Sequence, residues 1–436
     1  MAALRFALAA ATAAGAAAGA AAGAAAPLTT WQRVLLEGAA CLDGSSAAIY
    51  VKPGVGADAS KLILFWEGGG WCLSLEDCRG RSFTPLGSSL NYTSNTTRWS
   101  ARDVLLPDCA VNPRFCGWSS AYAPYCDGAS RSSNAAEPVV VDGRPLHFRG
   151  YDVLVATLAA LAQPDGPGFG MPALADVGEL LVSGSSAGGL TTLLHLDFVA
   201  EHARAANPAV RVVGVPEVGF FLDAQSIWGP HIYTEMYARV ADFGNVSAGL
   251  PEQVNADCVA ANADARWKCF MAQYTYPHVR TPTFLLQSSN DEWQAQNILA
   301  PNLDTSFDVT TYAPFEPCIM RPGPPGAGDC NATQWAQWFG YADQFFSALN
   351  ASRAATPPDT LARSGGVITS CPIHTTAIGG LSHRITIAGK TMYEWLVQWY
   401  DADASVPGGA WTIDKPYPGD ASCPKPAAIS DELAFM

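Results

Sequence analysis

The stretch that most constrains the fold is LVSGSSAGGLTTLLHLDF, residues 181–198. An apolar run stops there at a cluster of small residues and resumes at once with helical spacing. Residues 184–188, GSSAG, fit the pattern G-x-S-x-G, which is typical of a sharp strand-to-helix turn that exposes the side chain of its serine, here Ser186. Glycine and serine are common, so the motif alone also suits an ordinary tight turn. Features elsewhere in the chain are needed to distinguish a catalytic serine from such a turn.

Apolar segments and amphipathic segments alternate on both sides of this turn. Runs rich in β-branched and apolar residues predict strands at 62–66, 178–184, 210–224, from Pro282 onward, and in 365–374. Apolar residues spaced by three and four predict helices at 147–162, 187–203 and 389–402. Such alternation predicts an α/β fold, with a mainly parallel central sheet and helices on both of its faces. No repeat or linker divides residues 27–436, so we expect one domain.

The N-terminal 26 residues differ from the rest of the chain. They carry one early cation, Arg5, followed by an Ala/Gly-rich segment with an A-x-A-like site at 24–26. This pattern predicts a cleaved secretory signal peptide. A weak membrane anchor and a low-complexity extension are the alternatives. Alanine is only marginally apolar, and no other segment approaches the ~18 apolar residues of a membrane span, so we expect no stable anchor.

The chain contains 12 cysteines, all downstream of that segment. Cysteines in this number are typical of disulfides formed in an oxidising compartment. No pair of C-x-x-C motifs has zinc-site spacing, so we expect neither a metal nor a cofactor. The pairs Cys72–Cys78, Cys258–Cys269 and Cys318–Cys330 would close short loops, although the sequence leaves the connectivity open.

Five N-x-S/T sequons also indicate secretion and glycosylation, at Asn91, Asn95, Asn245, Asn331 and Asn350. The formal net charge of −14 argues against a nucleic-acid partner, because phosphates require a basic surface. The same charge mildly disfavours a strongly anionic polymer. We therefore expect a secreted, extracellular or cell-wall protein, monomeric, without nucleic-acid or membrane partners.

A catalytic serine on such a turn needs a base and an acid, in the chain order Ser, Asp or Glu, His. Asp291 follows the apolar run that begins at Pro282, and only His374 and His383 come after it. His374 lies closer to the end of its strand, so Ser186, Asp291 and His374 are the predicted triad. In that arrangement the imidazole takes the serine proton and the carboxylate orients the imidazole.

Other assignments remain open for the acidic and imidazole groups. Asp291 could simply cap the end of its strand, with Glu292 or Asp304 as the acid. Asp223 could be a structural or substrate-binding carboxylate. A structural role is expected for His195, on a helix face, and for His147.

The strand at 62–66 runs directly into three glycines, in the segment KLILFWEGGGWC. Backbone without side chains can approach a substrate closely and direct N–H groups at a developing oxyanion. A glycine turn beside a disulfide at Cys72 is the alternative. The position of this loop upstream of G-x-S-x-G favours the oxyanion role.

The chain resembles the pectin acetylesterase family, which includes the Notum-like carboxylesterases. Eight segments carry the resemblance in order along the chain: CLDGSSAAIYV, EGGGWC, YCDGAS, HFRG, SGSSAGGL, GFFLDA, DEWQAQNILAP and SCPIH. The resemblance implies an α/β-hydrolase-like fold with disulfide-bonded insertions, the same triad, and an oxyanion hole formed by the backbone N–H groups of Gly70, Trp71 and Ala187. Thr375 and Thr376, after His374, depart from the cysteine and glutamine of plant members, and Ser185 stands where those members usually have cysteine.

The expected function is that of a secreted serine carboxylesterase. Its substrate would be the O-acetyl esters of a cell-wall or extracellular polysaccharide such as pectin, hydrolysed through an acyl-enzyme. Three alternatives stay open: a Notum-like esterase for lipid chains, a non-catalytic glycan-binding module, and a serine peptidase, which only the family resemblance disfavours. Because the chain is acidic, a neutral acylated glycan is an alternative to pectin.

Overall fold

The computed structural model describes residues 29–101, 103–244, 253–301, 330–374, 380–402, 411–417 and 423. The predicted signal peptide, the sequon at Asn245 and the predicted disulfide partner Cys318 lie outside these residues. So do Asp304, Thr375 and Thr376.

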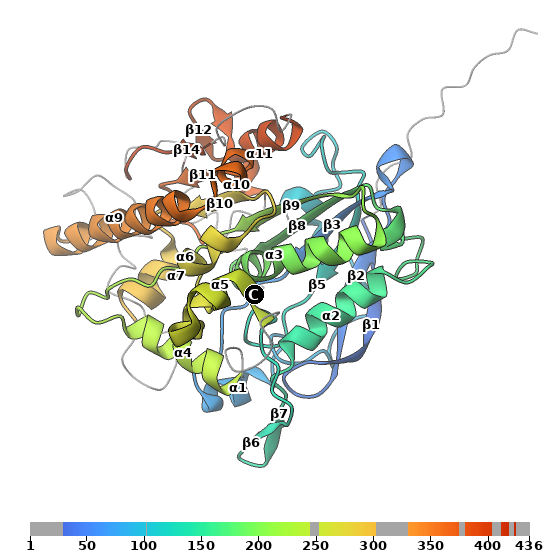
Figure 1. Cartoon of the computed structure of the whole chain (residues 1–436), viewed down its shortest axis with the longest axis horizontal. Helices are drawn as coiled ribbons and strands as arrows, with labels where there is room; N and C mark the ends of the chain where they lie inside the picture. Colours follow the sequence, from blue (N-terminus) through green and yellow to red (C-terminus); the bar gives the residue numbers. More distant parts are fainter. Residues whose placement is uncertain are drawn as a thin grey trace, which may run out of the picture.

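A ten-stranded sheet forms the centre of the molecule (Figure 1), in the order β14-β11-β10-β9-β8-β3-β5-β2-β1-β4. Its strands are β1 Trp31–Ala40, β2 Ser46–Lys52, β3 Lys61–Trp66, β4 Asn95–Thr96, β5 Ser119–Ala123, β8 Glu179–Ser185, β9 Arg211–Glu217, β10 Phe284–Ser288, β11 Gly365–Thr369 and β14 Trp411–Ile413. Neighbours from β14 to β5 run parallel, whereas β2, β1 and β4 pair antiparallel at one edge. The predicted mainly parallel sheet is confirmed; the antiparallel edge is an addition to it.

Helices connect the strands and flank the sheet. They are α1 Leu75–Arg81, α2 Gly150–Leu161, α3 Ala187–Ala206, α4 Ile232–Phe243, α5 Ala256–Ala261, α6 Ala272–Thr275, α7 Glu292–Gln294, α9 Ala332–Ala355, α10 Pro358–Arg363 and α11 Met392–Asp401. Two short hairpins lie apart from the main sheet, β6 Val139–Val141 with β7 Arg144–Leu146, and β12 Thr386–Ile387 with β13 Lys390–Thr391. Short 3-10 turns and one π turn, Ala295–Leu299, complete the connections.

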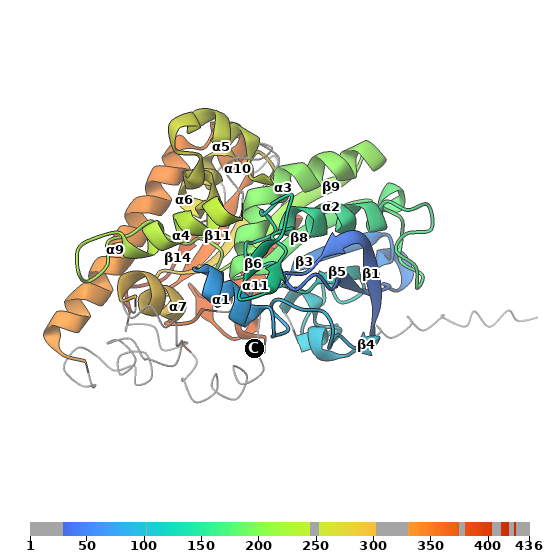
Figure 2. The same cartoon turned by 90° about the horizontal axis from the view of Figure 1, so that it is seen from below.

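The two faces of the sheet are covered by different helices because side chains of a strand alternate between its faces. In β3, Leu62, Leu64 and Trp66 pack with side chains of α2 and α3. Ile63 and Phe65 of the same strand belong to the cluster of α11 on the opposite face. Figures 1 and 2 show α2 and α3 lying side by side along the sheet. The predicted coverage of both faces is therefore confirmed.

The 24-residue helix α9 is not among the elements predicted above. It begins at a capping box in which the Asn331 side chain accepts from the Gln334 backbone while the Gln334 side chain accepts from the Asn331 backbone. Its buried face carries Trp335, Trp338 and Tyr341, which join a cluster that also includes Trp71 of the glycine loop. The helix thereby contributes to the surroundings of the candidate site.

Five disulfides join described cysteines: Cys41–Cys126, Cys72–Cys78, Cys109–Cys116, Cys258–Cys269 and Cys371–Cys423. Two of the three short loops predicted from spacing are thus formed. Cys371–Cys423 fastens the segment after β11 to the C-terminal region. Over the described part of the chain, no helix combines the length and the apolar character needed to cross a membrane.

Candidate active site

Ser186 occupies a sharp turn between β8 and α3. Its φ of +58° is rare for a residue with a side chain and marks a strained backbone. The flanking glycines allow the turn: a Cβ on Gly188 would lie 2.0 Å from the Trp66 carbonyl oxygen, and one on Gly184 would lie 2.3 Å from the Gly188 carbonyl oxygen. Close backbone packing therefore requires the glycines of G-x-S-x-G and leaves the serine at the apex.

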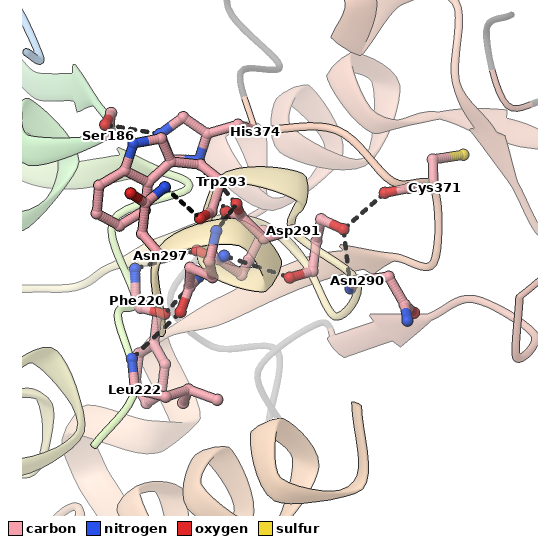
Figure 3. Close-up of polar contacts among 12 residues, drawn as sticks. Ser186, Phe220, Leu222, Asn290, Asp291, Trp293, Asn297, Cys371 and His374 are labelled. Carbon is pink, nitrogen blue, oxygen red and sulfur yellow. Dashed lines mark hydrogen bonds and ion pairs between the residues drawn. The ribbon is translucent and has the colours of Figure 1, made fainter. Parts of the chain in front are cut away.

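The imidazole of His374 lies between Ser186 and Asp291 (Figure 3). Its Nε2 is 2.7 Å from the Ser186 hydroxyl oxygen, and its Nδ1 is 2.9 and 3.0 Å from the two carboxylate oxygens of Asp291. Because a carboxylate can only accept, Nδ1–H donates to Asp291 and Nε2 is left to accept from the Ser186 hydroxyl. The three side chains come from the ends of β8, β10 and β11, which release them at the same edge of the sheet.

Asp291 is fully buried, with an exposed fraction of 0%. It is also the N-cap of α7, since the backbone N–H of Gln294 donates to its Oδ1 at 3.0 Å. A buried carboxylate must be paired and hydrogen-bonded to be tolerated. Asp291 thus caps the start of α7, rather than the end of a strand, and the same carboxylate contacts His374.

Gln294 is a neighbour of this carboxylate that the sequence reasoning missed. Its side-chain amide donates to Asp291 Oδ2 and to the Phe220 carbonyl, each at 3.3 Å. Its Oε1 accepts from the Leu222 N–H at 3.2 Å and from the Tyr341 hydroxyl at 2.8 Å. A signal was present in the sequence: the spacing Asp-x-x-Gln is that of an N-cap followed by a glutamine at the third helical position.

A serine hydroxyl joins the two loops that carry Asp291 and His374. Ser288, at the end of β10, donates to the Cys371 carbonyl at 2.7 Å and accepts from the Asn290 N–H at 3.1 Å. Cys371 lies three residues before His374. The hydroxyl therefore fixes the loop of the acid relative to the loop of the imidazole.

Glu292, the alternative acid, lies beside the same imidazole. Burial raises the pKa of its carboxyl to about 7; the charge of His374 opposes that rise and the charge of Asp291 adds to it. It is Asp291, and not Glu292, whose oxygens are within hydrogen-bond distance of His374 Nδ1. Glu292 is thus a titratable group next to the site rather than part of the hydrogen-bonded chain.

The remaining candidates form no hydrogen bond with the Ser186 side chain among the described residues. His383 packs on Tyr393 with 4.0 Å between ring centroids. Asp223 accepts from His231 and Thr234, both at 2.6 Å, and from Tyr274 at 2.5 Å. The Asp223 carboxylate is therefore the shared acceptor of hydrogen bonds from these three side chains.

The contacts of His195 and His147 are those of histidines that pack within the fold. His195 is completely buried on α3, its Nε2 lies 3.1 Å from the Ser132 hydroxyl oxygen, and burial lowers its pKa to about 3. The ring of His147 packs on Gly44, where an added Cβ would lie 2.9 Å from Nε2. Within the described ranges, no three His, Cys, Asp or Glu side chains converge on a point that could hold a metal ion.

The glycine loop after β3 packs directly on the serine turn. A Cβ on Gly68 would lie 2.3 Å from the Ser185 carbonyl oxygen and 2.8 Å from Ser186 Cβ. Gly70 has a φ of +64°, a conformation that favours glycine. No described residue accepts a hydrogen bond from the N–H groups of Gly70, Trp71 or Ala187. Those three donors are the ones predicted for the oxyanion hole.

Aromatic side chains form a wall beside His374. Trp293 stacks on the imidazole with 5.5 Å between centroids, and Phe221 lies 6.1 Å from it. Trp71 contacts Phe221 edge-on at 4.7 Å. The Trp71 indole N–H donates to the Ser130 hydroxyl at 2.8 Å, and that hydroxyl donates to the Ala187 carbonyl at 2.9 Å. The wall is therefore tied to both the glycine loop and the serine turn.

Known proteins that are similar to this chain in sequence are esterases. Residues 20–424 match the Pectinacetylesterase family. Pectin acetylesterase 5 of Arabidopsis thaliana is 30% identical over 391 residues, covering 88% of this chain and 82% of the relative. The palmitoleoyl-protein carboxylesterase NOTUM of Drosophila melanogaster is 31% identical over 276 residues, which cover 60% of this chain but only 37% of that protein.

The fold is also that of a solved structure. The Wnt deacylase Notum from Drosophila superposes with a TM-score of 0.68 over 91% of this chain and 99% of the other, at 22% sequence identity. This likeness confirms the predicted α/β-hydrolase-like fold. The family match extends over most of the sequence, and both groups of relatives are carboxylic ester hydrolases by name. The chain therefore belongs to the pectinacetylesterase family.

Proposed function

We propose that this protein is a secreted serine carboxylesterase that removes O-acetyl groups from a cell-wall or extracellular polysaccharide such as pectin. One observation carries the proposal: a continuous hydrogen-bonded chain runs from Ser186 through His374 to Asp291 at a strained turn. This geometry is what an activated serine nucleophile requires. Membership of the family and the pectin acetylesterases among the relatives support the choice of substrate.

The proposed reaction has two halves. His374 Nε2 takes the proton of the Ser186 hydroxyl as the oxygen attacks the acetyl carbonyl, and Asp291 stabilises the imidazolium that forms. The N–H groups of Gly70, Trp71 and Ala187 would stabilise the oxyanion, a contribution of about 10²–10³ in rate for one such donor. His374 then protonates the departing sugar oxygen. In the second half the imidazole activates a water, which releases acetate and restores the Ser186 hydroxyl.

A second candidate is the hydrolysis of longer acyl esters, as in the palmitoleoyl-protein carboxylesterases among the relatives. The observation in its favour is the aromatic wall of Trp71, Phe221 and Trp293 beside the imidazole, because such side chains can contact an apolar chain. A non-catalytic glycan-binding role is disfavoured, since binding alone has no use for a connected serine, histidine and aspartate.

Several observations support the proposed secretion. Five disulfides among the described cysteines suit an oxidising compartment. Four sequons have exposed asparagines, Asn91, Asn95, Asn331 and Asn350. We also propose cleavage of residues 1–26 as a signal peptide, one catalytic domain in the mature chain, and action as a monomer.

A substrate panel tests the proposal. Acetate release is measured on acetylated pectin and on neutral acetylated glycans, beside p-nitrophenyl esters from acetyl to octanoyl. We expect acetate release from at least one polysaccharide and a kcat/KM that falls as the chain lengthens. A lipid pocket would reverse this trend, because each buried methylene contributes about 0.8 kcal/mol. A rise from acetyl to octanoyl, without acetate release from any glycan, would favour the second candidate.

A further inference from the structure

Arg81, the last residue of α1, holds the glycine loop from outside. Its Nη1 donates to the Gly69 carbonyl at 2.6 Å and its Nη2 donates to the Trp71 carbonyl at 3.3 Å. The side chain is only partly exposed, and it forms no ion pair with any described carboxylate. Its guanidinium is thus directed at the backbone of the loop, where its rigid fork of donors fits two carbonyls at once.

The geometry of the peptide bond turns this contact into a constraint on the proposed oxyanion hole. In a planar trans peptide, the C=O and the following N–H point in opposite directions. With the Gly69 carbonyl directed at Arg81, the N–H of Gly70 must point away from Arg81. The positive φ of Gly70 makes the loop intrinsically free to adopt other conformations, because glycine tolerates many. Arg81 selects one of them.

A short covalent loop fixes Arg81 relative to the segment that it holds. The Cys72–Cys78 disulfide joins the residue after Trp71 to the helix that ends at Arg81. The Asp77 carboxylate accepts from the Leu73 N–H at 2.9 Å, and the Cys72 N–H donates to the Gly128 carbonyl at 3.3 Å. The disulfide and these hydrogen bonds therefore restrict how far the guanidinium can move relative to the loop.

We infer that Arg81 is a positioning residue for the oxyanion hole, acting through the backbone of Gly69 to Trp71. This inference rests on the proposed esterase mechanism. Arg81 keeps the Gly70 N–H aimed before the substrate arrives, so that no reorganisation is required as charge develops. Its charge also strengthens both hydrogen bonds to the loop, because bonds from an ionised donor are shorter and stronger than neutral ones.

The test compares Arg81→Ala with Arg79→Ala. Arg79 lies on the same helix and carries the same charge, but it faces Asp142 at 3.6 Å and the Phe83 ring instead of the loop. Each variant is assayed for kcat and KM on p-nitrophenyl acetate. Each is also assayed for inhibition by a trifluoromethyl ketone, which forms a tetrahedral oxyanion adduct with an active serine, and for its melting temperature.

For Arg81→Ala we expect kcat to fall by about 10–100-fold, somewhat less than the loss of one oxyanion donor. KM should change little, and the trifluoromethyl ketone should lose affinity by a factor similar to that in kcat. A purely structural role would lower the melting temperature without this matched loss. Arg79→Ala should resemble the wild type. An Arg81→Ala protein with wild-type kcat and wild-type inhibitor affinity would overturn the inference.

If Arg81→Ala does not fold, Arg81→Lys tests the positioning role of Arg81 instead. A lysine keeps the charge but presents a point donor rather than a fork, so an intermediate loss in both kcat and inhibitor affinity is expected. Unchanged values would overturn the inference. Ser186→Ala, assayed in parallel, separates the two proposals: if it stays active, the proposed esterase mechanism itself fails. If it is inactive while Arg81 variants behave as wild type, only the role of Arg81 fails.

Discussion

Gln294 binds the carboxylate of Asp291 twice, with its backbone N–H on Oδ1 at 3.0 Å and its side-chain amide on Oδ2 at 3.3 Å. Both oxygens of Asp291 also face Nδ1 of His374. Since the same glutamine is held by Tyr341 of α9 and by the backbone of Phe220 and Leu222, the orientation of the acid depends on helix α9 and on the segment that follows β9.

Gln294→Met tests this dependence. Methionine has a similar size but no hydrogen-bonding amide, so it leaves the buried Leu222 N–H and Tyr341 hydroxyl without their acceptor. Each such buried polar group costs about 1–3 kcal/mol. We expect a clearly lower melting temperature and a reduced kcat. The control is Gln296→Met, two residues along the chain, which should change neither; equal behaviour of the two variants would contradict the role of Gln294.

Asp291→Asn should preserve the fold and still remove most of the activity. Asparagine is as good an N-cap as aspartate, so α7 keeps its first hydrogen bond. An amide can nevertheless present N–H to His374 and select the wrong tautomer, which costs about 10⁴-fold in kcat in a serine protease triad. Circular dichroism and kcat on p-nitrophenyl acetate measure the two effects. Retention of near wild-type kcat would exclude Asp291 as the acid.

His374→Ala and His383→Ala should differ sharply. Only His374 lies within hydrogen-bond distance of Ser186, whereas His383 packs on Tyr393. We therefore expect His374→Ala to be nearly inactive, and His383→Ala to keep its kcat even if the loss of packing lowers its melting temperature. The opposite pattern in kcat would show that the base was assigned to the wrong loop.

Glu292→Gln should change how stability depends on pH. The folded-state pKa of Glu292 is raised to about 7, chiefly by burial, above its ordinary value of 4.5. Between these values the unfolded chain has lost the proton while the folded chain retains it, so this residue makes the wild type less stable as pH rises from about 4.5 to 7. Glutamine does not titrate. The melting temperature of the variant, relative to wild type, should therefore be higher at pH 8 than at pH 4.5; an unchanged difference would contradict the raised pKa.

Much of the fold could be predicted because its parallel strands are short and apolar and are bounded by residues typical of turns. The strand of residues 178–184 and the helix after it were predicted within a few residues of β8 and α3. The strand predicted at 210–224 was too long, since β9 ends at Glu217 and Val218 has a φ of +43°. An apolar composition continues past that point because Phe220 and Phe221 enter a core cluster without belonging to a strand.

Less of the surroundings of the candidate site could be predicted. Chain order and strand ends suffice to bring Ser186, Asp291 and His374 together, because parallel strands present their carboxyl ends at one edge. Arg81, Gln294 and Tyr341 reach the site from α1, α7 and α9. Their contacts depend on how separate elements pack, and local sequence spacing carries little information about such packing. The Asp-x-x-Gln spacing at Asp291 was the one local signal among these contacts.

The most direct test of the central claim is to label the enzyme with a fluorophosphonate and locate the modified residue by peptide mass spectrometry. The account predicts one phosphonylated residue, Ser186, with loss of p-nitrophenyl acetate hydrolysis in step with labelling. It also predicts no labelling in folded Ser186→Ala, whose kcat should fall by up to about 10⁶-fold. Labelling of another residue that abolishes activity, or near wild-type turnover by a pure Ser186→Ala preparation, would contradict the account.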